Sequence, residues 1–230
     1  MPVRMQMMFR TCRIASALLT LSACATTSEL ELPKTLGACD WHRLNGLSVL
    51  VYHDGKVDAF SVQGNTLEQR EVSTVVLESY PDNDPGMNYR KDLQAVYAGL
   101  PRNLPTGEPL GFPAAISPNG KRWAATIISD PARLTQLVMS DGAGTVRVSS
   151  APGFDLHSVA WSPDSSIMAI VETKTDVRIR NLRDLISPHA ITYSDVLLAV
   201  HDATGGPVCR YLLMKEARYS YAKMRWTTAP

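Results

Sequence analysis

The chain has 230 residues, and its 23 lysines and arginines nearly balance its 22 aspartates and glutamates, for a formal net charge of +1. This length fits one domain or at most two, and it is enough to bury a substantial apolar core. No basic patch stands out to neutralise phosphates, so we expect no nucleic-acid partner.

The first 24 residues carry a targeting pattern. Arg4, Arg10 and Arg13 accompany a short apolar run over residues 14–21, and the run ends in Leu21-Ser22-Ala23-Cys24. A positive start, a short apolar core and small residues before a cut are typical of a secretory signal. The last four positions resemble the lipobox of bacterial lipoproteins. This resemblance implies a signal peptide over residues 1–23, cleavage before Cys24 and acylation of Cys24, for example with palmitate. An ordinary signal peptide with a chance cysteine is the alternative.

The same resemblance predicts a cellular location. Residues 24–38 would be a lipidated tether, with membrane lipid as the partner of acylated Cys24, and residues 39–230 would be the folded domain. Loss of residues 1–23 would leave 20 basic and 22 acidic residues, a net charge of −2. Ala25 stands where an aspartate would resemble an inner-membrane retention signal, so we expect an outer-membrane anchor with the domain on the periplasmic side.

Cysteine usage agrees with export. Cys12 lies in the expected signal peptide, which leaves Cys39 and Cys209 as a pair in an oxidising compartment. We predict that these two cysteines form a disulfide. Two buried free thiols are the alternative, and Cys39 with His42 could instead be half of a metal site, although the sequence offers no matching second pair of ligands.

The domain begins with strand signals and continues into an irregular segment. Apolar runs at 47–52 and 57–62 flank Asp54-Gly55, which predicts a hairpin, and residues 72–77 are another strand candidate. Five prolines then punctuate residues 80–111, which we interpret as an insertion. Within it, Leu93, Val96, Tyr97 and Leu100 have helical spacing and Gly99 is a stop signal, so we expect one short helix packed on the core. A ligand lid or partner surface is the alternative.

An internal repeat follows. Ser117-Pro118-Asn119-Gly120 recurs 45 residues later as Ser162-Pro163-Asp164-Ser165, with apolar strands before and after each copy. Proline presets φ in such a turn, and the Asn or Asp side chain bonds back to the following amides. Gly120 suits a positive φ, which Ser165 would adopt at some cost. The first copy continues through strands near 137–139 and 146–148, and the second near 176–180.

Trp161-Ser162-Pro163-Asp164 closely resembles the TolB-type β-propeller repeat, whereas Ile116 to Gly120 lacks the tryptophan. The resemblance covers about residues 112–182 and implies an all-β fold: a partial or small β-propeller of three to four blade-like sheets, with Trp161 on an inner strand between blades. Two unrelated hairpins in a β-sandwich are the alternative.

The C-terminal part also reads as β. Residues 196–201 and 208–214 flank a turn at 202–206, and residues 219–226 form a further strand candidate. At this length at most four repeats fit, as a small closed propeller or as an open stack capped by the insertion. The aromatic side chains near the end, including Tyr221 and Trp226, are expected in packing, with a carbohydrate or peptide platform as the alternative.

Catalytic motifs are sparse. The chain has no Gly-x-Ser-x-Gly elbow and no phosphate-binding glycine loop. His53-Asp54 and His201-Asp202 fall at predicted turns, where Asp is a routine turn residue, so we predict no metal and no cofactor. We expect His157 to form a structural hydrogen bond between strands rather than to bind a ligand.

These observations predict a lipid-anchored binding or scaffold protein of the envelope, rather than an enzyme, acting through contacts with an envelope protein. The alternatives are an envelope enzyme acting on peptide or glycan, which facing His53 and His201 would favour, and a small-molecule or metal sensor.

Overall fold

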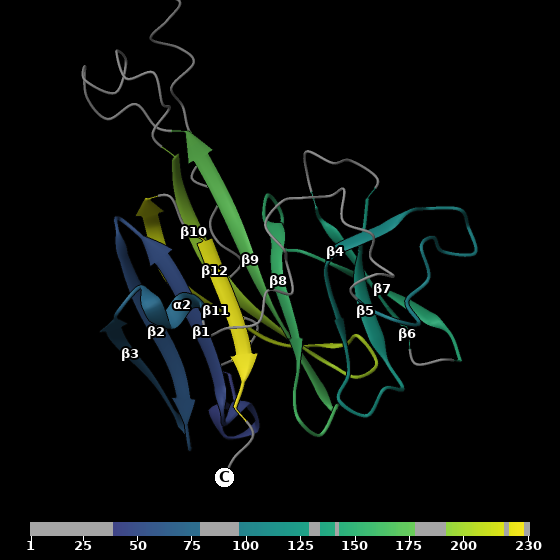
Figure 1. Ribbon diagram of the computed structural model, residues 1–230, viewed down its shortest axis with the longest axis horizontal. Helices are drawn as coiled ribbons and strands as arrows, with labels where there is room; N and C mark the ends of the chain where they lie inside the picture. Colours follow the sequence, from purple (N-terminus) through teal and green to yellow (C-terminus); the bar gives the residue numbers. More distant parts are fainter. Residues whose placement is uncertain are drawn as a thin grey trace, which may run out of the picture. The chain divides into compact units, whose positions relative to one another are not determined.

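The computed structural model describes residues 39–78, 97–128, 134–140, 143–177, 192–218 and 221–227, all within one compact unit that spans Thr35–Pro230. These residues form three four-stranded antiparallel sheets (Figure 1). The predicted all-β class is therefore confirmed. The first sheet has the order β12 (Tyr221–Trp226), β1 (Leu47–His53), β2 (Lys56–Gln63) and β3 (Thr66–Val72). The second has β4 (Leu110–Ile116), β5 (Trp123–Ile127), β6 (Gln136–Ser140) and β7 (Thr145–Ser149), and the third β8 (Asp155–Trp161), β9 (Ile167–Val177), β10 (Thr192–Asp202) and β11 (Pro207–Arg218).

The predicted hairpins form where turn chemistry allows them. Asp54 and Gly55 have φ of +48° and +78°, the left-handed pair that joins β1 to β2 in register His53↔Lys56. The β10–β11 hairpin also forms, and its turn at 203–206 is held by Asp202, whose carboxylate accepts the N–H groups of Thr204 and Gly206. The Thr204 hydroxyl, which also donates to this carboxylate, and then these backbone bonds keep the pKa of Asp202 below its ordinary value.

The first sheet takes its fourth strand from the far end of the sequence. β12 pairs antiparallel with β1 from Leu47↔Trp226 to Tyr52↔Tyr221. Figure 1 shows β12 in yellow beside β1, which comes from the start of the described chain. The expected strand at 219–226 is present over Tyr221–Trp226, with residues 219–220 outside the described residues, and its partner is a strand near the opposite end of the described chain.

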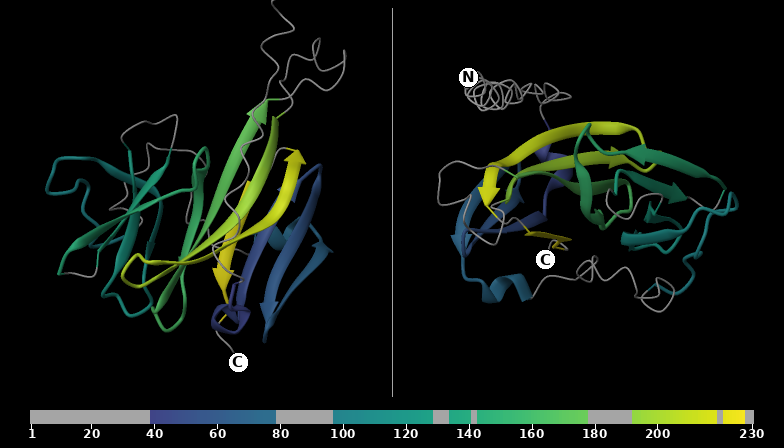
Figure 2. Two further views of the ribbon diagram at one scale, coloured as in Figure 1. Left: turned by 180° about the vertical axis from the view of Figure 1, so that it is seen from behind. Right: turned by 90° about the horizontal axis from the view of Figure 1, so that it is seen from above.

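The third sheet lies between the other two, and both of its faces are buried. On β9, Ala169 and Val171 pack in one apolar cluster with Val49 and Phe60 of the first sheet. Met168 and Ile170, which point to the opposite face, pack with residues of the second sheet. Figure 2 shows the same order of sheets from behind and from above. A continuous buried run such as 167–173 is what a doubly covered strand requires.

The outer faces of the first and second sheets are covered from the segment that joins them. Val76, in the short helix α2 (Val75–Glu78), packs beside Leu50 and Val57 of the first sheet. Leu100 and Leu104 pack on the second sheet. The segment around 80–111 therefore contributes apolar side chains to the core at its described, C-terminal end.

Three local predictions are corrected. Residues 72–77 do not form a strand, because β3 ends at Val72 and α2 follows after Ser73 and Thr74. The predicted helix at 93–100 is a turn where it is described, over residues 97–100 with Gly99 at φ +90°, while Leu93 and Val96 lie outside the described residues. No separate strand starts near 176, because β9 runs unbroken to Val177, and residues 178–180 lie outside the described residues.

Cys39 and Cys209 form the predicted disulfide. Cys39 precedes the 3₁₀ helix η1 (Trp41–Leu44), which leads into β1, and Cys209 lies on β11. The bond therefore fastens the first sheet to the outermost strand of the third. Trp41 adds an edge-to-face contact with Tyr211, with ring centroids 5.1 Å apart. Among the helices of the described residues, none has the length and apolarity needed to cross a membrane.

Candidate functional site

The first strand of each sheet ends in the same local arrangement. We call β4, β8 and β12 the leading strands. Each pairs its last residue with the first or second residue of the next strand in its sheet: Ile116↔Trp123, Trp161↔Met168 and Trp226↔Leu47. The three sheets thus share this closing arrangement, and Trp226-Thr227 stands where the sequence repeat has Trp161-Ser162.

The three sheets also share a hydrogen bond at this closing end. The residue after each leading strand donates its N–H to a carbonyl just before the next strand or at its start: Ser117 to Arg122 at 2.9 Å, Ser162 to Ile167 at 2.9 Å, and Thr227 to Gly46 at 2.8 Å. In the third copy the donor and acceptor come from opposite ends of the described chain. This copy is not visible as a sequence repeat, because no turn joins β12 to β1.

In the two continuous copies, a hydroxyl and an amide or carboxylate organise the turn. The Ser162 hydroxyl donates to Asp164 at 2.5 Å, and the Ser166 N–H donates to the same carboxylate. These bonds hold the pKa of Asp164 below its ordinary value, with the Ser162 hydroxyl as the largest cause. Ser117 and Asn119 repeat the hydroxyl contact at 2.8 Å. These hydrogen bonds therefore fix the turn that carries each proline, Pro118 or Pro163.

The two turns also contact each other. The Asn119 N–H donates to the Ser165 hydroxyl at 3.3 Å, and the Arg122 guanidinium donates to the Ser165 carbonyl at 2.8 Å. Ser165 is fully buried and has φ +61°, whereas Gly120 at the matching position has φ +68°. A positive φ strains the backbone of serine more than that of glycine. At this position, however, the serine hydroxyl accepts the Asn119 N–H, a hydrogen bond that glycine could not form.

The leading strands and these turns line a groove with a volume of about 360 Å³. Its lining is mainly apolar and aromatic: Tyr97, Ala115, Ile116, Pro118, Val159, Ala160, Trp161, Pro163, Met224, Arg225 and Trp226. All three sheets contribute, together with Tyr97 from the segment before β4. Pro118 and Pro163 are exposed, whereas Trp161 is buried. An apolar hollow of this volume with few polar groups is typical of a binding site.

The lining includes two indole nitrogens that lack partners. The indole nitrogens of Trp161 and Trp226 are buried, and neither has a hydrogen-bond partner within the described part of the chain. Trp161 is only 5% exposed. A buried donor without an acceptor costs about 1–3 kcal/mol, so the two nitrogens are a local cost to stability, and neither is open to the groove.

His157 lies near the groove on β8 and contacts β12. Its ring makes an edge-to-face contact with Tyr221, with centroids 5.4 Å apart. Burial lowers the pKa of His157 to about 4, so the imidazole is neutral at ordinary pH. We expected His157 to form a hydrogen bond between strands. Its Nε2 forms none, because this atom is buried without a partner among the described residues. The ring serves as a packing group.

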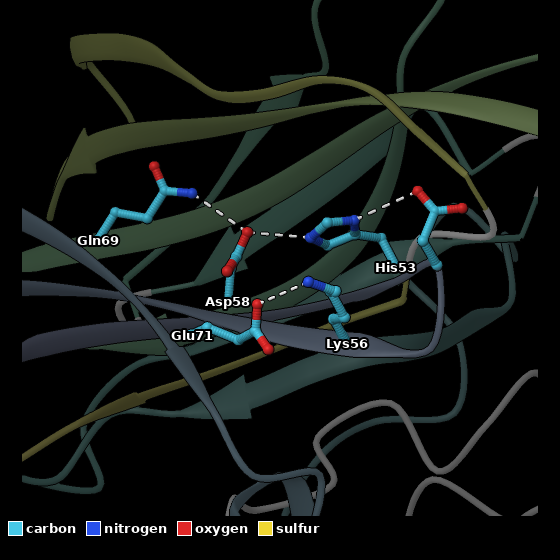
Figure 3. A network of polar contacts seen from close by, with 6 residues as sticks. His53, Lys56, Asp58, Gln69 and Glu71 are labelled. Atoms are coloured by element: carbon cyan, nitrogen blue, oxygen red, sulfur yellow. Dashed lines mark hydrogen bonds and ion pairs between the residues drawn. The ribbon is translucent and has the colours of Figure 1, made fainter.

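A second polar cluster lies on the first sheet (Figure 3). His53 Nε2 is 2.9 Å from Asp58, and the Gln69 amide donates to the same carboxylate at 3.1 Å. Lys56 and Glu71 pair nearby at 3.0 Å, and this pairing raises the pKa of the exposed Lys56 ammonium. These contacts join β1, β2 and β3 across the strands, which is a structural role.

The third cluster is buried beside the second sheet. Glu172 on β9 accepts the Ala151 N–H at 2.9 Å, and Arg210 on β11 lies 3.7 Å from its other oxygen. Arg210 also donates to the Ser149 carbonyl at 3.1 Å. Burial raises the pKa of Glu172 and is the largest cause of the shift. This pair clamps the connection from β7 to β8.

The two His-Asp pairs of the sequence stay apart. His53 and His201 belong to the first and third sheets and share no contact given by the structure, and His201 bonds instead to the Gly205 carbonyl at 3.2 Å. Within the described ranges, no group of three or more His, Cys, Asp or Glu side chains is arranged to hold a metal ion. Cys24 and the lipobox lie outside the described residues.

Comparison with known proteins adds no family: no protein-family model matches the chain, and no curated protein matches it significantly.

Proposed function

We propose that this protein is a lipid-anchored binding or scaffold module of the bacterial envelope. Acylated Cys24 would hold it in the outer membrane, and a TolB-like, partial propeller of three blades would contact an envelope protein on the periplasmic side. The observation that carries the binding role is the groove at which all three leading strands meet, with its mainly apolar and aromatic lining.

The propeller interpretation rests on the threefold repetition. Three meanders share one hydrogen-bonded closure at the leading strand, and the first is completed by a strand from the other end of the sequence. In a ring of blades, the pairing of a late strand with an early one within a single blade would close the ring. The described residues form three sheets, so we propose an open stack, with the segment before β4 covering the outer face of the second sheet.

The anchor and the export route rest on separate features. The lipobox pattern predicts lipidation, and the disulfide of Cys39 with Cys209 is typical of a protein that folds in an oxidising compartment. An anchor confines the module to a surface and so raises its effective concentration for partners there.

The test is a pull-down from chemically cross-linked envelopes of cells that express the tagged full-length chain. Cys24→Ala is the matched control, because it removes the acylation site and leaves the folded domain intact. We expect a specific envelope protein to be recovered with the natural chain and lost, or strongly reduced, with Cys24→Ala. Metabolic labelling with a palmitate analogue checks the anchor itself. Recovery of the same proteins from both forms, with no lipid label on either, would contradict the proposal.

A further inference from the structure

We propose that one surface of the domain docks on the phospholipid interface of the membrane, with the rings of Trp41 and Tyr211 among the lipid headgroups. This η1–β11 surface comprises Trp41 and Arg43 of η1 and Tyr211 of β11, the edge strand of the third sheet. The inference rests on the proposed lipid anchor, and it names the face of the domain that the anchor turns toward the bilayer.

The first argument is the place at which the proposed tether reaches the domain. The tether begins at Cys24 and ends at Cys39, 15 residues further along the chain. Such a segment spans at most about 50 Å even when it is fully extended. Cys39 is bonded to Cys209, so η1 and β11 meet at the point of attachment. The anchor therefore keeps this surface near the bilayer and raises its effective concentration there.

The second argument is an exposed aromatic side chain at this point. Among the aromatic residues that the structure describes, only Tyr211 is exposed, at 38%. Its ring meets the half-buried Trp41 edge to face, with centroids 5.1 Å apart. Trp41 and Tyr211 each lie two residues after a disulfide cysteine, so the bond holds both rings beside the end of the tether. Tryptophan and tyrosine are the side chains enriched at membrane interfaces, because each has an apolar ring and a polar tip.

The third argument is the charge and size of the surface. Arg43 is exposed in η1, two residues after Trp41, and a guanidinium donates readily to phosphate oxygens. The acidic residue beside it, Asp40, caps η1 by accepting the His42 N–H at 3.2 Å. Two aromatic rings are too small for a stable protein interface, which buries about 800 Å² on each partner. They suffice on a membrane, because the anchor already supplies the attachment.

The test is quenching of tryptophan fluorescence by brominated lipid. The natural chain, purified from envelopes, is bound to vesicles of phosphatidylethanolamine and phosphatidylglycerol, with or without a phospholipid brominated near its headgroup. We expect the brominated lipid to quench the natural chain. Trp41→Phe should remove about half of this quenching or more, because Trp41 is the tryptophan at the interface. Trp123→Phe, on the second sheet, is the matched control and should leave the quenching unchanged.

A charge reversal provides a second variant that does not alter the aromatic pair. Arg43→Glu places a carboxylate against the anionic vesicles and should reduce the quenching about twofold or more. Lys121→Glu makes the same change at an exposed turn of the second sheet and should have no effect. Quenching that is equal in the natural chain, Trp41→Phe and Arg43→Glu would overturn the inference, provided that circular dichroism shows at least one of the two variants folded.

The outcomes separate this inference from the proposed function. If mass spectrometry finds the acyl group and the vesicles bind the chain, but the two variants are quenched like the natural chain, the anchor stands and the docking surface is wrong. If the chain carries no acyl group yet binds the vesicles with Trp41 quenched, the anchor is wrong and the docking surface stands. A chain with no acyl group that does not bind the vesicles would overturn both.

Discussion

Thr227 and Gly46 lie 181 residues apart in the sequence, and the Gly46 carbonyl accepts both the backbone N–H of Thr227, at 2.8 Å, and its hydroxyl, at 2.9 Å. This junction takes the place of the turn that closes the other two sheets. The first sheet is therefore held at its closed end by noncovalent contacts alone, where its counterparts have continuous chain.

Crowding at this junction predicts an effect of replacing Gly46. Gly46 has φ +83°, and a Cβ there would lie 2.7 Å from the Thr227 carbonyl oxygen. We expect Gly46→Ala to lower the free energy of unfolding by roughly 1–3 kcal/mol more than Gly55→Ala, because of the added clash. Gly55 is the matched control, with φ +78° and open space for 4 Å around the point that an alanine Cβ would occupy. Urea unfolding of both variants measures the difference, and equal losses would argue against a tight junction.

The disulfide predicts a redox-dependent stability. Cys39 and Cys209 enclose a sequence separation of 170 residues, and a cross-link over a long loop removes much entropy from the unfolded chain. We expect the double variant Cys39→Ser/Cys209→Ser to be about 2–5 kcal/mol less stable than the oxidised natural chain.

A reductant supplies the control for that measurement. Dithiothreitol should lower the stability of the natural chain toward that of the double variant, whose own unfolding curve should not move. A natural chain that unfolds identically with and without reductant would mean that the bond contributes nothing.

The half-buried His157 predicts a loss of stability in mild acid. Its pKa falls from the ordinary 6.5 to about 4, so the folded state binds a proton less readily than the unfolded state does. Its contribution is thus fully present above pH 6.5 and is lost as the pH falls through the window from 6.5 to 4. At about 1.4 kcal/mol per unit, the loss is on the order of 3 kcal/mol.

His157→Phe isolates this contribution, because phenylalanine keeps the edge-to-face contact with Tyr221 and has no proton to bind. Urea unfolding at pH 7, 5.5 and 4 should show the natural chain losing stability relative to the variant. Parallel pH profiles for the two proteins would show that His157 is accessible to protons in the folded state.

The contribution of Glu172 to stability should depend on pH in the opposite direction, because burial raises the pKa of this side chain. The folded state then binds the proton more tightly than the unfolded state, so this contribution is present at low pH and is lost as the pH rises through the raised pKa. Glu172→Gln keeps an acceptor for the Ala151 N–H and does not titrate. The natural chain should therefore become less stable relative to the variant as the pH rises from the ordinary value of 4.5 toward neutrality. A difference that is constant across this range would contradict the prediction.

The sequence predicted local structure well where turn chemistry and alternation coincide. Asp54-Gly55 and the two Ser-Pro turns are short-range signals, and the strands beside them formed as expected. The third copy of the repeat was missed because Trp226 and Leu47 become neighbours only through the fold. The helix expected at 93–100 is a turn over residues 97–100, where Tyr97 and Leu100 pack on the second sheet, and residues 93–96 lie outside the described part of the chain.

The groove was beyond sequence reasoning for a related reason. We expected Trp161 on an inner strand between blades, and it is buried on β8 among residues of the second and third sheets, but Trp226 was expected only in packing near the end of the chain. Their shared site depends on how three sheets are placed, and nothing in the spacing of the two residues encodes that placement. The unpaired state of both indole nitrogens among the described residues is likewise visible only once every nearby acceptor has been located.

The strand that completes the first sheet is also the last described strand to be synthesised. Until β12 emerges, β1 has an open edge, and the junction of Thr227 with Gly46 has no donor. For a chain that is exported as we propose, the first sheet cannot be completed until β12 has also crossed the membrane. The first sheet would therefore stay incomplete during translocation and would finish folding only on the far side of the membrane.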